Sequence, residues 1–322
     1  MSVPMIIDTD PGVDDAVALM LTAASPEVQL LAVTTVFGNA GVEITTANAL
    51  RLRVLAGLGH LPVAAGAARP LVYPQHQRAK EQRAQCKHGL DGLGGRAHLL
   101  PEPIGPLDAR GAVALMADVL SAAVAPVTLV AIGPLTNIAL LLTTHPKVKP
   151  RINRIVAMGG HLSGGPPAEF NIRSDPEAAR RVLVEEDVPA ALVPLDLTLR
   201  AAVDGAWLAE LAAAGPRCAV LAGVIEHYRE HRRKLDREHG REVSGRHTVA
   251  LHDSLAVLEA AVPGTLHTTP MRLEVICDHG PDRGTVQADG GHGTGERAVQ
   301  VALDADLPSI NATILDRLRS LR

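Results

Sequence analysis

Aromatic side chains are scarce in this chain of 322 residues: phenylalanine, tyrosine and tryptophan together make up 2% of it, with a single tryptophan. Cysteine is scarce as well, since only Cys86, Cys218 and Cys277 are present, an odd number at wide spacing. This spacing offers no CxxC metal site and suits a reducing compartment. We therefore predict a cytoplasmic protein.

Long apolar runs are also missing. None approaches the roughly 18 residues that span a bilayer, and no basic region followed by a long apolar stretch opens the chain. A net charge of −4 argues against general binding to nucleic acids or membrane surfaces. No linker, low-complexity tract or internal repeat divides the sequence, and 47% of it is hydrophobic. We expect residues 1–322 to form one domain with a sizeable core.

Short apolar runs recur along the chain, and each is followed by a segment with helical periodicity. The runs lie at residues 4–8, 28–39, 127–134, 152–160 and 189–198. Valine- and isoleucine-rich runs that alternate with helices predict parallel strands joined by crossovers. We predict an α/β fold with a Rossmann-like core: an open, mostly parallel sheet flanked by helices. Ligands of such sheets bind at the carboxyl ends of the strands, where we expect the active site.

An acidic cluster follows the first run directly. Asp8, Asp10, Asp14 and Asp15 fall within eight positions in the stretch "DTDPGVDD". A purely structural explanation accounts for two of them, because Asp14 and Asp15 would favour the positive end of a helix dipole that begins near Pro11. It does not explain Asp8 and Asp10, which share one face of a strand end.

A hard divalent cation would neutralise the repulsion within this cluster. Calcium takes six to eight oxygen ligands and favours carboxylates, carbonyls and water. The spacing is not that of an EF-hand loop, so ligands from distant segments are needed. The segment "ALHDSLAVLEAAV" offers Asp253 beside His252. The alternative is that Asp253 caps a helix that ends before Pro263.

Several motifs resemble those of one family. "DTDPGVDDAVAL" is similar to the N-terminal signature of the inosine–uridine-preferring nucleoside hydrolases. "VFGN", "HGLDGLGG", "LVAIGPLTNIAL", "IVAMGG", "PAEFNIRSDPEAAR" and "LHDSLAV" follow in the family's order, so that the resemblance covers nearly the whole chain. It implies hydrolysis of the N-glycosidic bond of ribonucleosides to ribose and free base, with a bound Ca²⁺ ion.

The resemblance also implies roles for individual residues. The metal ligands would be the carboxylates of Asp10, Asp15 and Asp253 and the carbonyl of Ile132. The ribose hydroxyls would be bound by Asp14, Asn39, Asn171 and Asp253, the 5′-hydroxyl by Glu169, and the underside of the sugar by Met158. Asp8 would support the site from behind.

Cleavage passes through an oxocarbenium-like transition state, which buried carboxylates stabilise. Asp10, on the metal and near the attacking water, is our candidate general base. His252 is the candidate acid for the leaving base, because imidazole ordinarily titrates near neutrality. His88 is expected near the base. The family's purine-specific branch stacks the base between tryptophans, whereas Trp207 lies away from the motifs, which favours the inosine–uridine branch.

One departure from the family concerns the loop "HLSGGPPAEFN", which is short and lacks the asparagine that helps to bind the 5′-hydroxyl in relatives. Looser recognition of this end, contacts from His161 or Ser163, and a different 5′ group are the open alternatives.

Two other functions compete with this interpretation. The first is a phosphatase of the haloacid dehalogenase type, whose nucleophile also sits in a strand-end DxD. The second is an inactive, calcium-dependent ribose-binding protein. We expect a small-molecule ribonucleoside substrate, no nucleic-acid or membrane partner, and a homotetramer or homodimer.

Overall fold

A central sheet of eight strands organises the computed structural model, which describes residues 2–72, 89, 91–238, 248–288 and 298–321. Its strand order is β3-β2-β1-β4-β5-β6-β12-β9. All neighbours run parallel except β12 and β9. The strands are β1 (Val3–Thr9), β2 (Val28–Thr35), β3 (Val63–Ala65), β4 (Val127–Ala131), β5 (Ile152–Met158), β6 (Ala190–Val193), β9 (His267–Met271) and β12 (Val299–Asp304). The predicted fold class is confirmed.

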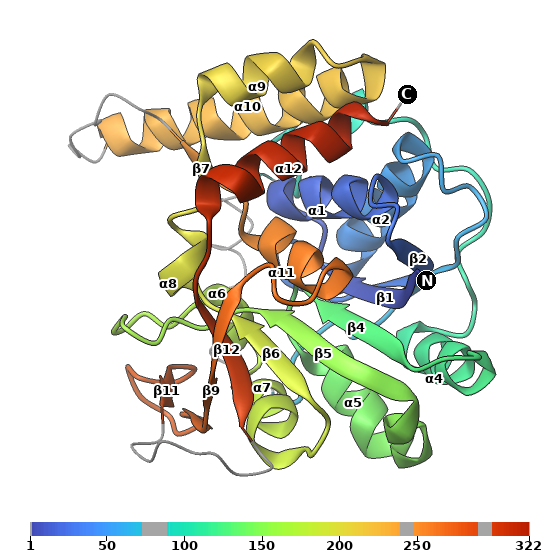
Figure 1. Cartoon of the computed structure of the whole chain (residues 1–322), viewed down its shortest axis with the longest axis vertical. Helices are drawn as coiled ribbons and strands as arrows, with labels where there is room; N and C mark the ends of the chain where they lie inside the picture. Colours follow the sequence, from blue (N-terminus) through green and yellow to red (C-terminus); the bar gives the residue numbers. More distant parts are fainter. Residues whose placement is uncertain (1, 73–88, 90, 239–247, 289–297, 322) are drawn as a thin grey trace.

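Helices cover both faces of this sheet (Figure 1). One face carries α1 (Val13–Ala23), α2 (Val42–Leu55), α9 (Gly205–Ala212), α10 (Pro216–Glu238), α11 (His252–Ala261) and α12 (Leu307–Arg319). The other carries α4 (Ala112–Ala122), α5 (Thr136–Thr144) and α7 (Pro176–Arg180). Alternation along β1 serves both layers, because Met5 and Ile7 join the first apolar cluster and Ile6 joins the second.

Smaller elements complete the chain. Two antiparallel pairs join β7 (Ala202–Val203) to β8 (Val249–Ala250) and β10 (Leu273–Val275) to β11 (Val286–Ala288). The short helices are α6 (Phe170–Ser174), α8 (Leu195–Thr198), two 3-10 turns at Ala97–Leu99 and Pro146–Arg151, and a π-helical turn at Arg181–Glu185. Within the described ranges, no helix combines the length and the apolar character that crossing a membrane requires.

Candidate active site

The site forms around the end of β1, the strand between β2 and β4 (Figure 1). The chain leaves β1 at Thr9, passes Asp10 and enters α1, whose first turn contains Asp14 and Asp15. Helix α11 packs against α1 and has Asp253 in its own first turn. This packing brings the acids of the two helices together.

Asp14, Asp15 and Asp253 converge most closely: one carboxylate oxygen from each lies within 4.8 Å of the other two. Asp15 and Asp253 are buried and Asp14 is partly buried. Across the part of the chain that the structure describes, no ion pair links these carboxylates to a lysine or an arginine. An oxygen-only donor set without a cationic partner fits a hard divalent metal ion.

Asp10 is fully buried at the edge of this group. Its Oδ2 accepts a hydrogen bond from the Asn39 backbone N–H at 2.6 Å, whereas its Oδ1 is buried without a partner among the described residues. Burial raises the pKa of Asp10 well above its usual range, and the charges of Asp15 and Asp14 raise it further. An unpaired buried carboxylate oxygen is costly in the protein alone, so it is available to a metal ion or a reacting proton.

Asp15 is held by several donors. The Thr9 hydroxyl donates to Oδ1 at 2.5 Å, and Oδ2 accepts from the Gly12 N–H at 2.9 Å and from Asn39 Nδ2 at 3.1 Å. The Gly12 bond also caps α1, so the structural explanation of this acid is partly right. Burial and the charge of Asp14 nevertheless raise the pKa of Asp15 to about 7.

Asp253 has no capping role, because Leu251 occupies the cap position of α11 and no side chain bonds there. Burial is the main cause that raises its pKa well above the usual range, followed by the charges of Asp14, Asp15 and Asp10. The helix-cap interpretation of Asp253 is therefore wrong.

Asp8 lies outside the converging group. Its Oδ1 accepts from Thr34 Oγ1 at 2.6 Å and from Asn137 Nδ2 at 2.8 Å. The backbone carbonyl of Asp8 accepts a hydrogen bond from the Ile132 N–H at 2.9 Å. This bond holds the backbone of Ile132, whose own carbonyl is the predicted metal ligand. Burial raises the pKa of Asp8 to about 7 despite the bonds from Thr34 and Asn137.

The loop after β5 contributes a second group of predicted residues. Glu169 is buried and caps α6: Oε1 accepts from the Asn171 N–H, and Oε2 accepts from the N–H groups of Gly160 and Ile172. Asn171 Nδ2 lies 3.1 Å from the Ile132 carbonyl and 3.2 Å from that of Met158. Burial raises the pKa of Glu169, opposed by its backbone donors and by the charge of His252.

His252 is the first residue of α11 and is partly buried. Its Nδ1 lies 2.8 Å from Thr198 Oγ1 in α8, so that bond orients the ring and leaves Nε2 for another partner. The charge of His252 acts to lower the pKa of Glu169, so the imidazole lies near that carboxylate. This geometry suits proton donation by Nε2.

The loop lacking the family asparagine is anchored from α8. Asp196 Oδ2 accepts the Leu162 N–H at 2.8 Å, and Oδ1 accepts the Ser163 N–H at 2.9 Å. The anchor fixes the backbone beside His161, one of the two side chains considered for the 5′ end.

His88 falls outside the described residues, so its position near the base stays a prediction. Trp207 lies in α9, and its Nε1 donates to the Asn311 carbonyl of α12 at 3.1 Å, so the single tryptophan packs these helices together. Sequence reasoning missed Thr198 and Asn137, which hold His252 and Asp8, because each partner lies far away along the chain.

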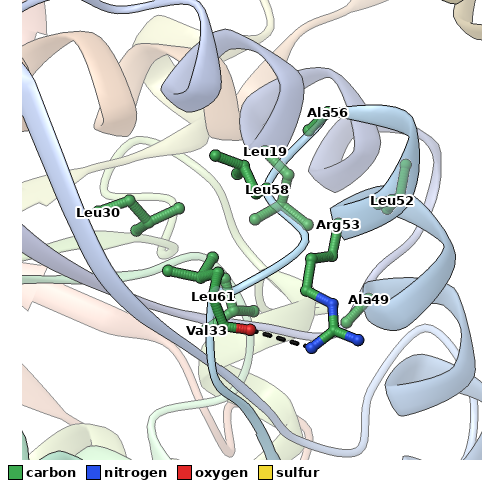
Figure 2. A pocket seen from close by; sticks show the side chains of 9 residues that line it. All are labelled: Leu19, Leu30, Val33, Ala49, Leu52, Arg53, Ala56, Leu58 and Leu61. Carbon is green, nitrogen blue, oxygen red and sulfur yellow. Dashed lines mark hydrogen bonds between the residues drawn. The ribbon is translucent and has the colours of Figure 1, made fainter. Parts of the chain in front are cut away.

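A small apolar pocket between α2 and β2 is separate from the site (Figure 2). Its lining residues are Leu19, Leu30, Val33, Ala49, Leu52, Arg53, Ala56, Leu58 and Leu61. The Arg53 guanidinium donates through Nη1 to the Leu61 carbonyl at 3.0 Å. The lining contains neither a carboxylate nor a histidine, so this pocket belongs to packing rather than to the chemistry.

The buried carboxylates around the end of β1 and the start of α11, with the imidazole of His252 beside them, form a site that can hold a metal ion. The chain belongs to the nucleoside hydrolases: the model of the inosine-uridine preferring nucleoside hydrolase family matches residues 5–312. The resemblance found in the sequence is thereby confirmed, and the phosphatase alternative is wrong.

Relatives and solved structures agree. The chain is 41% identical over 261 residues to the pyrimidine-specific ribonucleoside hydrolase RihA of Enterobacter sp. (strain 638), covering 80% of this chain and 78% of the relative. It superposes on a plant nucleoside hydrolase with a TM-score of 0.86 and 28% identity, covering 99% and 100% of the two chains. It superposes on a purine-preferring ribonucleoside hydrolase from Gardnerella vaginalis with a TM-score of 0.86 and 27% identity, and the match covers 99% of this chain and 98% of the other. The chain is a ribonucleoside hydrolase that cleaves N-glycosidic bonds.

Proposed function

We propose that the chain hydrolyses pyrimidine ribonucleosides in preference to purine ribonucleosides, with calcium as its metal ion. The relative at 41% identity is named as pyrimidine-specific, whereas the solved purine-preferring enzyme is 27% identical. The packing of Trp207 between α9 and α12 supports the same preference, because it leaves no tryptophan to stack on a purine.

The observation that carries the metal assignment is the convergence of Asp14, Asp15 and Asp253 without a cationic partner in the described chain. The proposed ligands are Asp10, Asp15, Asp253 and the Ile132 carbonyl. The three acids whose oxygens lie within 4.8 Å of one another are Asp14, Asp15 and Asp253. Asp14 is thus a fourth acid near the proposed ion, in addition to the three carboxylate ligands. Calcium bound there would orient the ribose hydroxyls and lower the pKa of the attacking water.

Side chains of the protein carry out the proton transfers and bind the ribose in this proposal. Asp10 accepts the water proton on Oδ1, its unpaired oxygen. His252 gives a proton to the leaving base from Nε2, since Nδ1 is engaged by Thr198. Asn39, Asn171 and Asp14 hold the ribose hydroxyls.

Two further side chains bind the rest of the sugar in this proposal. Glu169 accepts from the 5′-hydroxyl, and its Oε1 has only one backbone donor. Met158, at the end of β5, packs beneath the ring. The buried carboxylates stabilise the positive charge that develops on the sugar at the transition state.

Release of free base from uridine, cytidine, inosine, adenosine and 5′-modified nucleosides tests the proposal. We expect uridine and cytidine to have the highest kcat/KM, and prolonged dialysis against a chelator to abolish turnover until calcium is restored. Equal or faster hydrolysis of inosine would contradict the pyrimidine preference. Tight ribose binding without turnover would instead support the inactive binding protein. A homodimer or homotetramer and a cytoplasmic location stay predictions.

A further inference from the structure

Asp10 directly follows β1, whose two neighbours in the sheet are β2 and β4. Gly38 lies in the loop after β2 and Gly133 in the loop after β4. Both lie against the Asp10 carboxylate so closely that neither position has room for a side chain.

A Cβ atom built on Gly38 would lie 1.9 Å from Asp10 Oδ2 and 2.7 Å from its Cγ. The three atoms nearest to this Cβ all belong to Asp10. A Cβ atom on Gly133 would lie 2.6 Å from Asp10 Oδ1 and 2.9 Å from Val36 Cγ1. Neither glycine has a positive φ. The backbone thus allows alanine at both positions. Alanine at position 38 would collide with the Asp10 carboxylate, and alanine at position 133 would collide with the carboxylate and with Val36.

We propose that Gly38 and Gly133 are positioning residues that form a slot for the Asp10 carboxylate. Gly38 lets Oδ2 approach close enough to accept the Asn39 N–H at 2.6 Å. Gly133 leaves room for Oδ1, which is buried beside it and has no hydrogen-bond partner among the described residues. The slot therefore holds Oδ2 in a hydrogen bond to the protein and keeps Oδ1 free of hydrogen bonds from the described residues. Its catalytic consequence rests on the proposed role of Asp10 as general base.

The slot predicts a specific kinetic defect. Gly38→Ala must displace the carboxylate, and a misplacement of about 1 Å can reduce turnover on the order of 100-fold. We expect kcat to fall by at least about tenfold, a larger factor than the rise in KM, because the displacement reaches Asp10 and its bond from the Asn39 N–H but leaves Asn171 and Glu169 in place. Gly133→Ala should act in the same direction by covering Oδ1.

Two other glycines provide matched controls. A Cβ on Gly66 would meet the buried Asn137 amide at 2.3 Å, so Gly66→Ala creates a similar collision that does not involve Asp10. A Cβ on Gly59 has nothing within 4 Å, so Gly59→Ala should leave activity and melting temperature unchanged. Gly66→Ala should lower the melting temperature with a smaller loss of kcat than Gly38→Ala.

A thermal-denaturation cycle tests the slot without using activity. In an Asp10→Ala background, the atoms that Gly38→Ala meets at 1.9 and 2.7 Å are gone, and only Asp10 Cβ at 3.1 Å remains. Gly38→Ala should lower the melting temperature of the wild type and have little effect in Asp10→Ala. Equal losses in both backgrounds would overturn the slot. If the effect of Gly38→Ala on melting temperature depends on Asp10 but Asp10→Asn retains full turnover, the slot is supported and only the general-base role of Asp10 is excluded.

Discussion

Helix α11 carries two buried acids in opposite circumstances. Glu259, near its end, is 3% exposed and forms an ion pair with Arg154 at 3.0 Å. It also accepts N–H bonds from Gly264 and Leu266. Asp253, in the first turn, is 2% exposed and has no such cationic partner within the described ranges. Its neighbours are other acids, which together with burial raise its pKa.

The difference separates structural acids from functional ones. A buried carboxylate needs a compensating charge and hydrogen bonds, and removing them is strongly destabilising. The chain supplies both to Glu259. At the strand ends the described part of the chain supplies hydrogen bonds but no cation. Protonation therefore neutralises these carboxyls more readily, as their raised pKa values show, and a metal ion is what would compensate their ionised forms. Stability alone would not assemble these acids.

The largest effect is expected at the acid that touches the chemistry. Asp10→Asn should lower kcat on the order of 1000-fold, because the amide cannot accept the water proton. The fold should survive, since removing an uncompensated buried charge does not destabilise the metal-free protein. Steady-state release of free base measures the loss. A decrease of less than about tenfold, or ~1.4 kcal/mol of barrier, would exclude Asp10 as general base.

Removing the imidazole at the start of α11 should have the next largest effect. His252→Ala should slow hydrolysis of uridine or inosine roughly 100-fold, because the departing base lacks its proton donor. p-Nitrophenyl riboside has the same sugar but a leaving group that needs little protonation, so its hydrolysis should be largely spared. Equal losses on both substrates would show that His252 only positions Asp253.

The strands could be predicted from the sequence where their burial requires a continuous run of apolar residues. Apolar runs predict β1, β2, β4, β5 and β6, because strands of a covered parallel sheet are buried on both faces. Edge strand β9 has no such pattern: it reads "HTTPM" and none of its residues is fully buried. The prediction that residues 1–322 form one domain stays a prediction.

The site was predictable where its residues are close in sequence or share a family motif. The acids of "DTDPGVDD" and the pair His252–Asp253 are of this kind. Thr198 beside His252, Asn137 beside Asp8 and the Gly38 contact with Asp10 depend on how strand ends and helices meet. No local spacing encodes those contacts, so only the folded structure reveals them.

The structural end of α11 should respond in the opposite way to its functional end. Glu259→Gln should lower the free energy of unfolding by about 2 kcal/mol, since Arg154 loses a charged, hydrogen-bonded partner. The kcat should stay unchanged. Denaturant unfolding and base release measure the two effects, with Asp253→Asn as the reciprocal variant that should lose turnover and calcium binding. Loss of activity in Glu259→Gln at unchanged stability would break the distinction between the two ends.

The smallest effect concerns the pH dependence of calcium stabilisation. Burial raises the pKa of Asp15 in the folded protein to about 7, above its ordinary value of 3.8. Between these values the metal-free folded protein binds more protons than the unfolded chain, so this carboxyl lowers the unfolding free energy as pH rises towards 7. Calcium requires the ionised form and must displace the proton below about pH 7.

The gain in melting temperature that calcium gives over a chelator should therefore increase from about pH 5 to about pH 7, and the raised pKa values of Asp10 and Asp253 act in the same direction. One displaced proton corresponds to about 1.4 kcal/mol per pH unit. Asp8 is the matched control, because burial raises its pKa to about 7 as well, yet it lies outside the converging acids. Asp15→Asn should weaken the calcium effect and reduce its pH dependence, whereas Asp8→Asn should leave the calcium effect and its pH dependence unchanged. A calcium effect that is flat from pH 5 in the wild type would show that Asp15 is already ionised there.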